Sequence, residues 1–110
     1  MSDLQIKSEQ AVRIAKLNDE FRRGGQWMVT PSVMMLEDLH GLYKVIKEYE
    51  VFTEDNDPYG EHDFGNLSWN GVPIFWKIDY YDNCMEFGSE DPTNPDVTTR
   101  VLTIMLASEY

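Results

Sequence analysis

His62 is the residue whose neighbours best suit it to chemistry. It lies between two carboxylates, Glu61 and Asp63, and an imidazole beside a carboxylate can act as a general base. The same imidazole could bind a transition metal together with Asp63, Asp79 and Asp82. A third interpretation is structural, because a histidine hydrogen-bonded to nearby carboxylates can tie its loop to a sheet. A metal-dependent enzyme or metal-binding module centred on His62 therefore stays open as an alternative function.

The acid-rich segment before His62 partly matches a calcium-binding loop. With Asp55 at the first position of an EF-hand loop, Asp57 falls at the third and Gly60 at the sixth, where a turn is needed. The match then fails, because Asn66 stands at the last position, where a bidentate glutamate is required. The sequence favours a solvated turn whose Asp and Asn side chains bond their own backbone. We expect no cofactor.

Motifs for nucleophilic catalysis and for phosphate binding are missing from the sequence. Cys84 has no basic neighbour in sequence, and Ser68 lies in no elbow-type motif. The pair Gly24-Gly25 follows a predicted helix, whereas phosphate-binding glycines precede one. Paired carboxylates could serve a glycosidase, but nothing singles out a pair. We therefore expect a protein that is not an enzyme.

The acidity of the chain is concentrated in its second half. Residues 51–110 carry twelve acidic side chains against two basic ones, Lys77 and Arg100, whereas residues 1–50 are almost neutral. Duplex binding depends on Lys and Arg that neutralise phosphates, so direct nucleic-acid binding is disfavoured. A field of this sign attracts basic protein surfaces. An ordinary role in keeping the protein in solution is the alternative.

The acids suggest a mimic of nucleic-acid charge. A small rigid fold that displays carboxylates in rows could occupy a basic groove built for DNA or guide RNA. Acidic anti-CRISPR and anti-restriction inhibitors, which phages and mobile elements use, resemble this chain in being small, acidic and without an evident active site. We therefore hypothesise an inhibitor of a basic nucleic-acid-binding protein or CRISPR effector complex. The candidate contact residues, acids with three aromatic anchors, are Glu54, Asp55, Asp57, Tyr59, Glu61, Asp63, Tyr81, Asp82, Glu86, Phe87, Glu90 and Asp91.

Length and composition predict one small domain. The 110 residues leave room for a single core, and an apolar share of 42% is enough to favour folding. The single cysteine fits a reducing cytosol. The first thirty residues lack the uninterrupted apolar stretch of a signal peptide, and no run approaches membrane-spanning length. We expect a cytoplasmic protein with no membrane partner and an oligomeric state that the sequence leaves open.

The first half of the chain predicts two helices around a short strand. Ile14, Ala15 and Asn18 belong to an apolar pattern of helical spacing that begins near Leu4, and charged residues including Arg22 are predicted to face water. Gly24 and Gly25 end this helix. Residues 26–30 predict a strand and residues 37–49 a second helix.

The second half changes to strand periodicity. Asn70-Gly71 between residues 64–69 and 72–81 predicts a hairpin with a type I′ turn. Pro73 places the start of the second arm at a sheet edge or bulge. For residues 97–110 strand and helix compete, and Asn94-Pro95-Asp96 as a capping sequence favours helix. The predicted fold class is α+β, an antiparallel hairpin or sheet packed against two or three helices.

Several stretches together resemble a known family. Residues 14–22, 55–65 (DNDPYGEHDFG), 75–82 (FWKIDYYD) and 99–110 (TRVLTIMLASEY) are similar to a family of small bacterial proteins of unassigned function. The resemblance covers most of the chain and implies no catalytic residues. Members occur on bacterial chromosomes and mobile elements.

Overall fold

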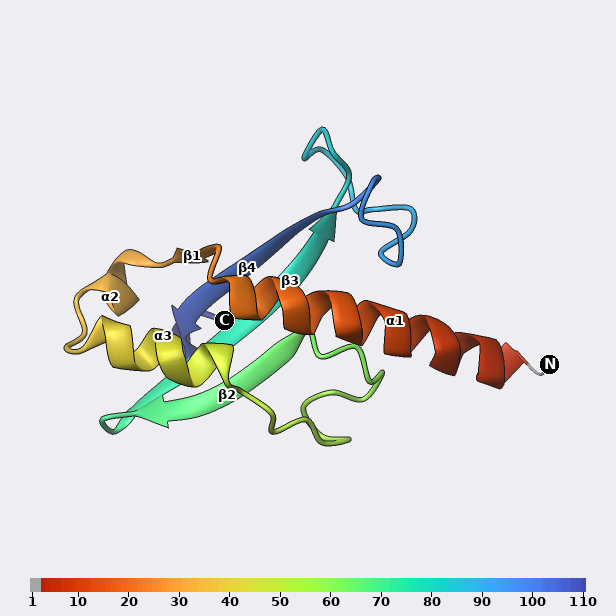
Figure 1. Ribbon diagram of the computed structural model, residues 1–110. Helices are drawn as coiled ribbons and strands as arrows, with labels where there is room; N and C mark the ends of the chain where they lie inside the picture. Colours follow the sequence, from red (N-terminus) through yellow and green to blue (C-terminus); the bar gives the residue numbers. More distant parts are fainter. Residues whose placement is uncertain (1–2) are drawn as a thin grey trace.

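A four-stranded mixed sheet carries helices on one face (Figure 1). This computed structural model describes residues 3–110, with side chains from residue 9 onward. The strands are ordered β1-β4-β3-β2, with β1 parallel to β4 and the other pairs antiparallel. The α+β prediction is confirmed. In chain order the elements are α1 (Asp3–Gly24), β1 (Trp27–Val29), α2 (Pro31–Met34), α3 (Leu39–Lys47), β2 (Phe64–Trp69), β3 (Val72–Tyr81), β4 (Thr99–Leu106) and the 3₁₀ helix η1 (Ala107–Glu109).

Helix α1 lies across the sheet and buries the predicted stripe from Ile14 to Asn18. The side chain of Leu4, which belongs to the same predicted pattern, lies outside the described side chains. The prediction that Arg22 faces water is wrong, because this side chain is 1% exposed. The helix ends where Gly25 adopts a left-handed φ of 74°, a conformation that glycine takes without steric cost.

The predicted hairpin is present with its predicted turn. Strands β2 and β3 pair from Phe64↔Lys77 to Trp69↔Val72. Asn70 and Gly71 both have the positive φ of a type I′ turn, 52° and 84°. Pairing of β3 with β4 begins only at Ile74, so Pro73 lies beyond the end of β4, as its missing N–H requires.

The core lies between the helices and one face of the sheet. Alternate β3 residues Ile74 and Trp76 are fully buried and pack with Leu42 and Ile46 of α3. This alternation is what a strand with one face against the core requires. None of the helices within residues 3–110 is long and apolar enough to span a membrane.

The prediction of a helix in residues 97–110 is wrong. Residues 99–106 form strand β4, which lies between β1 and β3, and Leu102 and Ile104 are fully buried on the core face. Asn94 does not cap a helix, because its side chain accepts a hydrogen bond from the amide of Asp96 within a turn. Pairing on both edges of β4 outweighs the local capping signal.

Candidate functional site

Sheet topology brings two acidic segments to the same end of the β2–β3 hairpin. The first acidic loop, residues 50–63, leads into the start of β2 and holds six carboxylates. The second acidic loop, residues 82–98, joins the end of β3 to the start of β4 and holds five. Neither contains Lys or Arg. Because these strands are antiparallel neighbours, both loops lie at the end of the hairpin away from the Asn70-Gly71 turn (Figure 1). We call this region the acidic end.

Asp57 fixes the shape of the first acidic loop. Its side chain is buried, at 7% residue exposure, and its carboxylate accepts hydrogen bonds from the amides of Glu61, at 3.1 Å, and His62, at 3.2 Å. Gly60 and His62 both adopt positive φ, which bends the loop back on itself. Asp57 therefore supports the loop from inside, and we leave it out of the candidate contact surface.

His62 joins the first acidic loop to α1. Its Nδ1 lies 3.0 Å from Oδ1 of Asp19, and its Nε2 lies 4.0 Å from Oδ2 of Asp57. Its ring stacks on Phe52 with centroids 3.9 Å apart and planes 3° from parallel. His62 is thus hydrogen-bonded to a carboxylate of helix α1. The sequence interpretation had the histidine connect its loop to the sheet instead.

Asn18 connects the two acidic loops. It is fully buried, and its Nδ2 donates to the backbone oxygen of Glu61 at 2.9 Å and to the Tyr80 hydroxyl at 2.8 Å. Its Oδ1 accepts from Nε of Arg100 at 2.7 Å. Arg100 in turn donates to the carbonyl of Pro92 in the second acidic loop. One side chain of α1 therefore sets the position of both loops.

Arg22 holds the beginning of the first acidic loop against the core. Its guanidinium packs against the rings of both Phe52 and Trp76, 5.4 and 5.3 Å from their centroids. It donates to Asp19 at 3.0 Å and to the backbone oxygen of Tyr49 at 3.0 Å. Sequence reasoning missed this role, because the aromatic partners lie thirty or more positions along the chain.

Burial and neighbouring charge perturb two ionisable groups here. Burial, together with the negative charges of Glu61 and Asp57, raises the pKa of the Asp63 carboxyl to about 6. Burial is also the main cause that raises the pKa of the Tyr80 hydroxyl far above its ordinary value. The hydroxyl therefore stays protonated and can donate to the Glu61 carboxylate at 3.2 Å.

The predicted contact residues divide by exposure. Tyr59 and Phe87 are 79% and 71% exposed, one in each acidic loop. Two carboxylates shape their own turns, since Asp82 accepts from the amide of Glu86 and Asp91 from the amide of Thr93. The exposed members are Glu54, Asp55, Tyr59, Glu86, Phe87, Glu90 and Asp91, and the half-buried ones are Glu61, Asp63, Tyr81 and Asp82.

The geometry does not assemble a metal centre from the described part of the chain. Within it, no three His, Cys, Asp or Glu side chains are grouped so that they could hold a metal ion. The structure pairs His62 with Asp19 and Asp57 instead of the set suggested from sequence.

Of three comparisons with known proteins, only the one with family models gives a match. No curated protein and no solved structure matches the chain significantly. The model of a family described as a protein of unknown function, DUF3768, matches residues 29–109, and the chain therefore belongs to this family.

Proposed function

We propose that this protein acts by binding, and that its acidic end occupies a basic surface of a partner protein that otherwise holds nucleic acid. The observation that carries the proposal is the placement of both acidic loops at one end of the sheet, joined through the buried Asn18. CRISPR effector complexes and restriction enzymes are the class of partner that we favour.

Charge at the acidic end supplies steering and register. The two loops hold eleven of the twenty carboxylates and no Lys or Arg. Duplex DNA carries about one negative charge per 1.7 Å of axis, so a basic DNA groove suits a dense row of carboxylates. Such complementarity raises association rates and suppresses wrong partners more than it adds affinity.

Exposed aromatic residues supply the affinity that charge does not. Tyr59 and Phe87 are exposed on the two loops, and Met85, at 50% exposure, lies two positions before Phe87 in the chain. Buried aromatic anchors carry much of the binding energy in protein interfaces, whereas rim charges contribute little. The hydrogen bonds through Asn18 also favour binding, because loops held in place before binding lose less entropy.

The test is capture from bacterial lysate followed by competition. We expect the immobilised protein to retain a nucleic-acid-binding protein at about 50 mM salt and to release it at about 500 mM, because screening weakens exposed charge pairs. Duplex DNA should displace the same partner. If the retained partner binds no nucleic acid, or if DNA fails to displace it, the proposal is wrong.

A matched pair of double variants separates local charge from net charge. Glu54→Gln/Glu86→Gln removes one exposed carboxylate from each acidic loop, and neither side chain supports the fold through a hydrogen bond to a described residue. Glu37→Gln/Glu48→Gln makes the same change outside the loops. We expect the first to weaken binding about tenfold and the second less than about twofold.

A further inference from the structure

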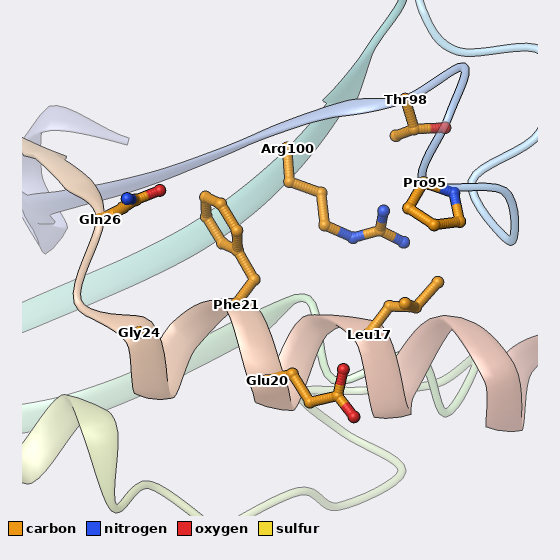
Figure 2. A pocket seen from close by; sticks show the side chains of 8 residues that line it. All are labelled: Leu17, Glu20, Phe21, Gly24, Gln26, Pro95, Thr98 and Arg100. Atoms are coloured by element: carbon orange, nitrogen blue, oxygen red, sulfur yellow. The ribbon is translucent and has the colours of Figure 1, made fainter.

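A hollow of about 470 Å³ lies between α1 and the segment that leads into β4. We call it the α1–β4 hollow. Figure 2 shows that Leu17 and Phe21 rise from the helix toward Arg100 and Pro95, so that an apolar wall faces a guanidinium. Its size falls in the range of small-molecule sites. Its walls include Leu17, Glu20 and Phe21 of α1 and, across from them, Pro95, Thr98 and Arg100.

The Arg100 guanidinium in this hollow has no acidic partner among the described side chains. Of the two cations in residues 51–110, Lys77 pairs with Asp79 at 2.9 Å. No described carboxylate lies within 4.0 Å of Arg100, although the chain has twenty. Arg100 therefore forms no salt bridge with a described carboxylate, although carboxylates are abundant in this protein.

The guanidinium is also held in place. Asn18 accepts from its Nε at 2.7 Å and the Pro92 carbonyl accepts from Nη2, while the Tyr80 ring lies 5.3 Å from its Cζ. An arginine has five N–H donors, so three remain after these two bonds. Half-burial lowers the pKa of Arg100, but an arginine stays charged in any ordinary buffer.

We propose that the α1–β4 hollow binds a small monocarboxylate, whose carboxylate accepts from Arg100 and whose apolar body lies against Leu17 and Phe21. The planar fork of a guanidinium matches a carboxylate in two parallel hydrogen bonds. The site is separate from the proposed function, which uses the exposed acids and aromatics of the loops.

The surroundings favour a single negative charge over two. Glu20 lines the hollow, and the negative charge of Glu61 acts on Arg100. A phosphate dianion would meet about twice the repulsion of a carboxylate from these two groups, and the single guanidinium can neutralise only one of its charges. An apolar body is favoured because the side chains facing the guanidinium are a leucine, a phenylalanine and a proline.

Phenylacetate is a suitable probe, with phenylacetamide as its uncharged counterpart. In an NMR titration of the whole chain, we expect phenylacetate to shift the Leu17 methyl signals, the Thr98 amide and the Arg100 Nε–H with one saturation curve. Phenylacetamide should bind about tenfold more weakly, because it offers no charge to the guanidinium. This comparison uses the unaltered protein and does not depend on any variant folding.

Two substitutions on α1 place the site. Leu17→Glu puts a carboxylate into the hollow beside Arg100 and should weaken phenylacetate binding about tenfold. Val12→Glu adds the same charge to an exposed position of the same helix and should change binding less than about twofold. The proposal is overturned if no saturable shift occurs up to about 20 mM probe, if the amide binds equally well, or if Leu17→Glu binds like Val12→Glu.

Discussion

Asn18 satisfies polar groups from three different parts of the chain. All of its partners, the Glu61 carbonyl, the Tyr80 hydroxyl and the Arg100 guanidinium, are at least 43 positions away in sequence. A buried polar group without a partner costs more than a hydrogen bond adds, so removing the amide harms each partner as well. The acidic end thus depends on one residue of α1 that bears no charge.

Replacing Asn18 by leucine should destabilise the protein strongly. The leucine fills the space but leaves three partners without their bonds, and we expect a loss of about 2 to 4 kcal/mol in the free energy of unfolding. Urea unfolding followed by tryptophan fluorescence measures it. Lys16→Leu, an exposed site on the same helix, should change stability by less than about 0.5 kcal/mol. Equal effects at both positions would contradict the role given to Asn18.

Asp63 should make stability depend on pH in the direction opposite to most carboxylates. Burial and nearby acids raise its pKa from 3.8 to about 6, so the folded protein binds this proton more tightly than the unfolded chain. The associated stability is present below about pH 4 and is lost as pH rises to about 6. Asp63→Asn should therefore stabilise the protein at pH 7, by about 1 kcal/mol after allowance for solvent screening.

The measurement is the free energy of unfolding of wild type and Asp63→Asn between pH 4 and pH 7. Their difference should grow across that window and vanish at its acidic end. Asp55→Asn removes the same charge from an exposed position and controls for net charge. A difference that stays constant with pH would show that Asp63 ionises as an ordinary surface carboxylate.

At the scale of elements, the pairing of β2 with β3 depends on a glycine, which has no side chain. Gly65 pairs with Trp76 and is buried against its indole, and a Cβ at Gly65 would overlap that ring. Trp76 is itself fully buried in the core and contacts Tyr49 and Phe52 edge to face. The ring therefore has little freedom to move away.

Gly65→Ala should cost about 1 to 3 kcal/mol, the usual penalty for overpacking a filled core. Thermal unfolding measures the change. Gly24→Ala is the matched control, because a Cβ there meets nothing within 4 Å and the residue has no positive φ. The control should be neutral or slightly stabilising. A Gly65→Ala protein as stable as the control would show that β2 can shift away from Trp76.

The same elements show which parts of the fold local sequence can predict. The hairpin was predicted to the residue, because a type I′ turn at Asn70-Gly71 and alternation along β3 are local properties. Strand β4 was mispredicted as helix, since its place between two partner strands is decided by tertiary pairing. The prediction that Arg22 faces water is wrong because the two aromatic rings that it contacts lie far from it in the sequence.

The sequence predicted which acidic residues belong to the candidate site but not how they are arranged. The acids of residues 51–110 were visible in the sequence, but the sequence did not show whether they share one face. Antiparallel pairing places most of them at the end of the hairpin away from Asn70-Gly71. The bonds through Asn18 and the withdrawal of Asp57 into its loop could not be predicted, because they depend on contacts between α1 and distant loops.

At the scale of the molecule, the acidic loops carry the net charge, and helix α1 holds these loops in place. The DUF3768 match covers strands β2 to β4 and both acidic loops but only the last residue of β1. It leaves out α1, which supplies Asn18, Asp19 and Arg22 to hold those loops. The two acidic loops hold eleven carboxylates and no Lys or Arg, while acids and bases balance in the rest of the chain. The net charge of -11 is therefore concentrated in these loops. Carboxylates held close together repel one another, and this repulsion lowers the stability of the folded state.

Screening should relieve this repulsion. Between about 20 mM and 300 mM sodium chloride the Debye length falls from about 20 Å to about 6 Å, so the unfolding temperature should rise by about 4 °C or more. The rise should be smaller in Glu54→Gln/Glu86→Gln, which removes charge from the acidic end, than in Glu37→Gln/Glu48→Gln, which has the same net charge. Differential scanning calorimetry of the three proteins measures both slopes. Identical slopes in the two variants would mean that net charge alone matters and that the acidic end holds no special concentration of repulsion.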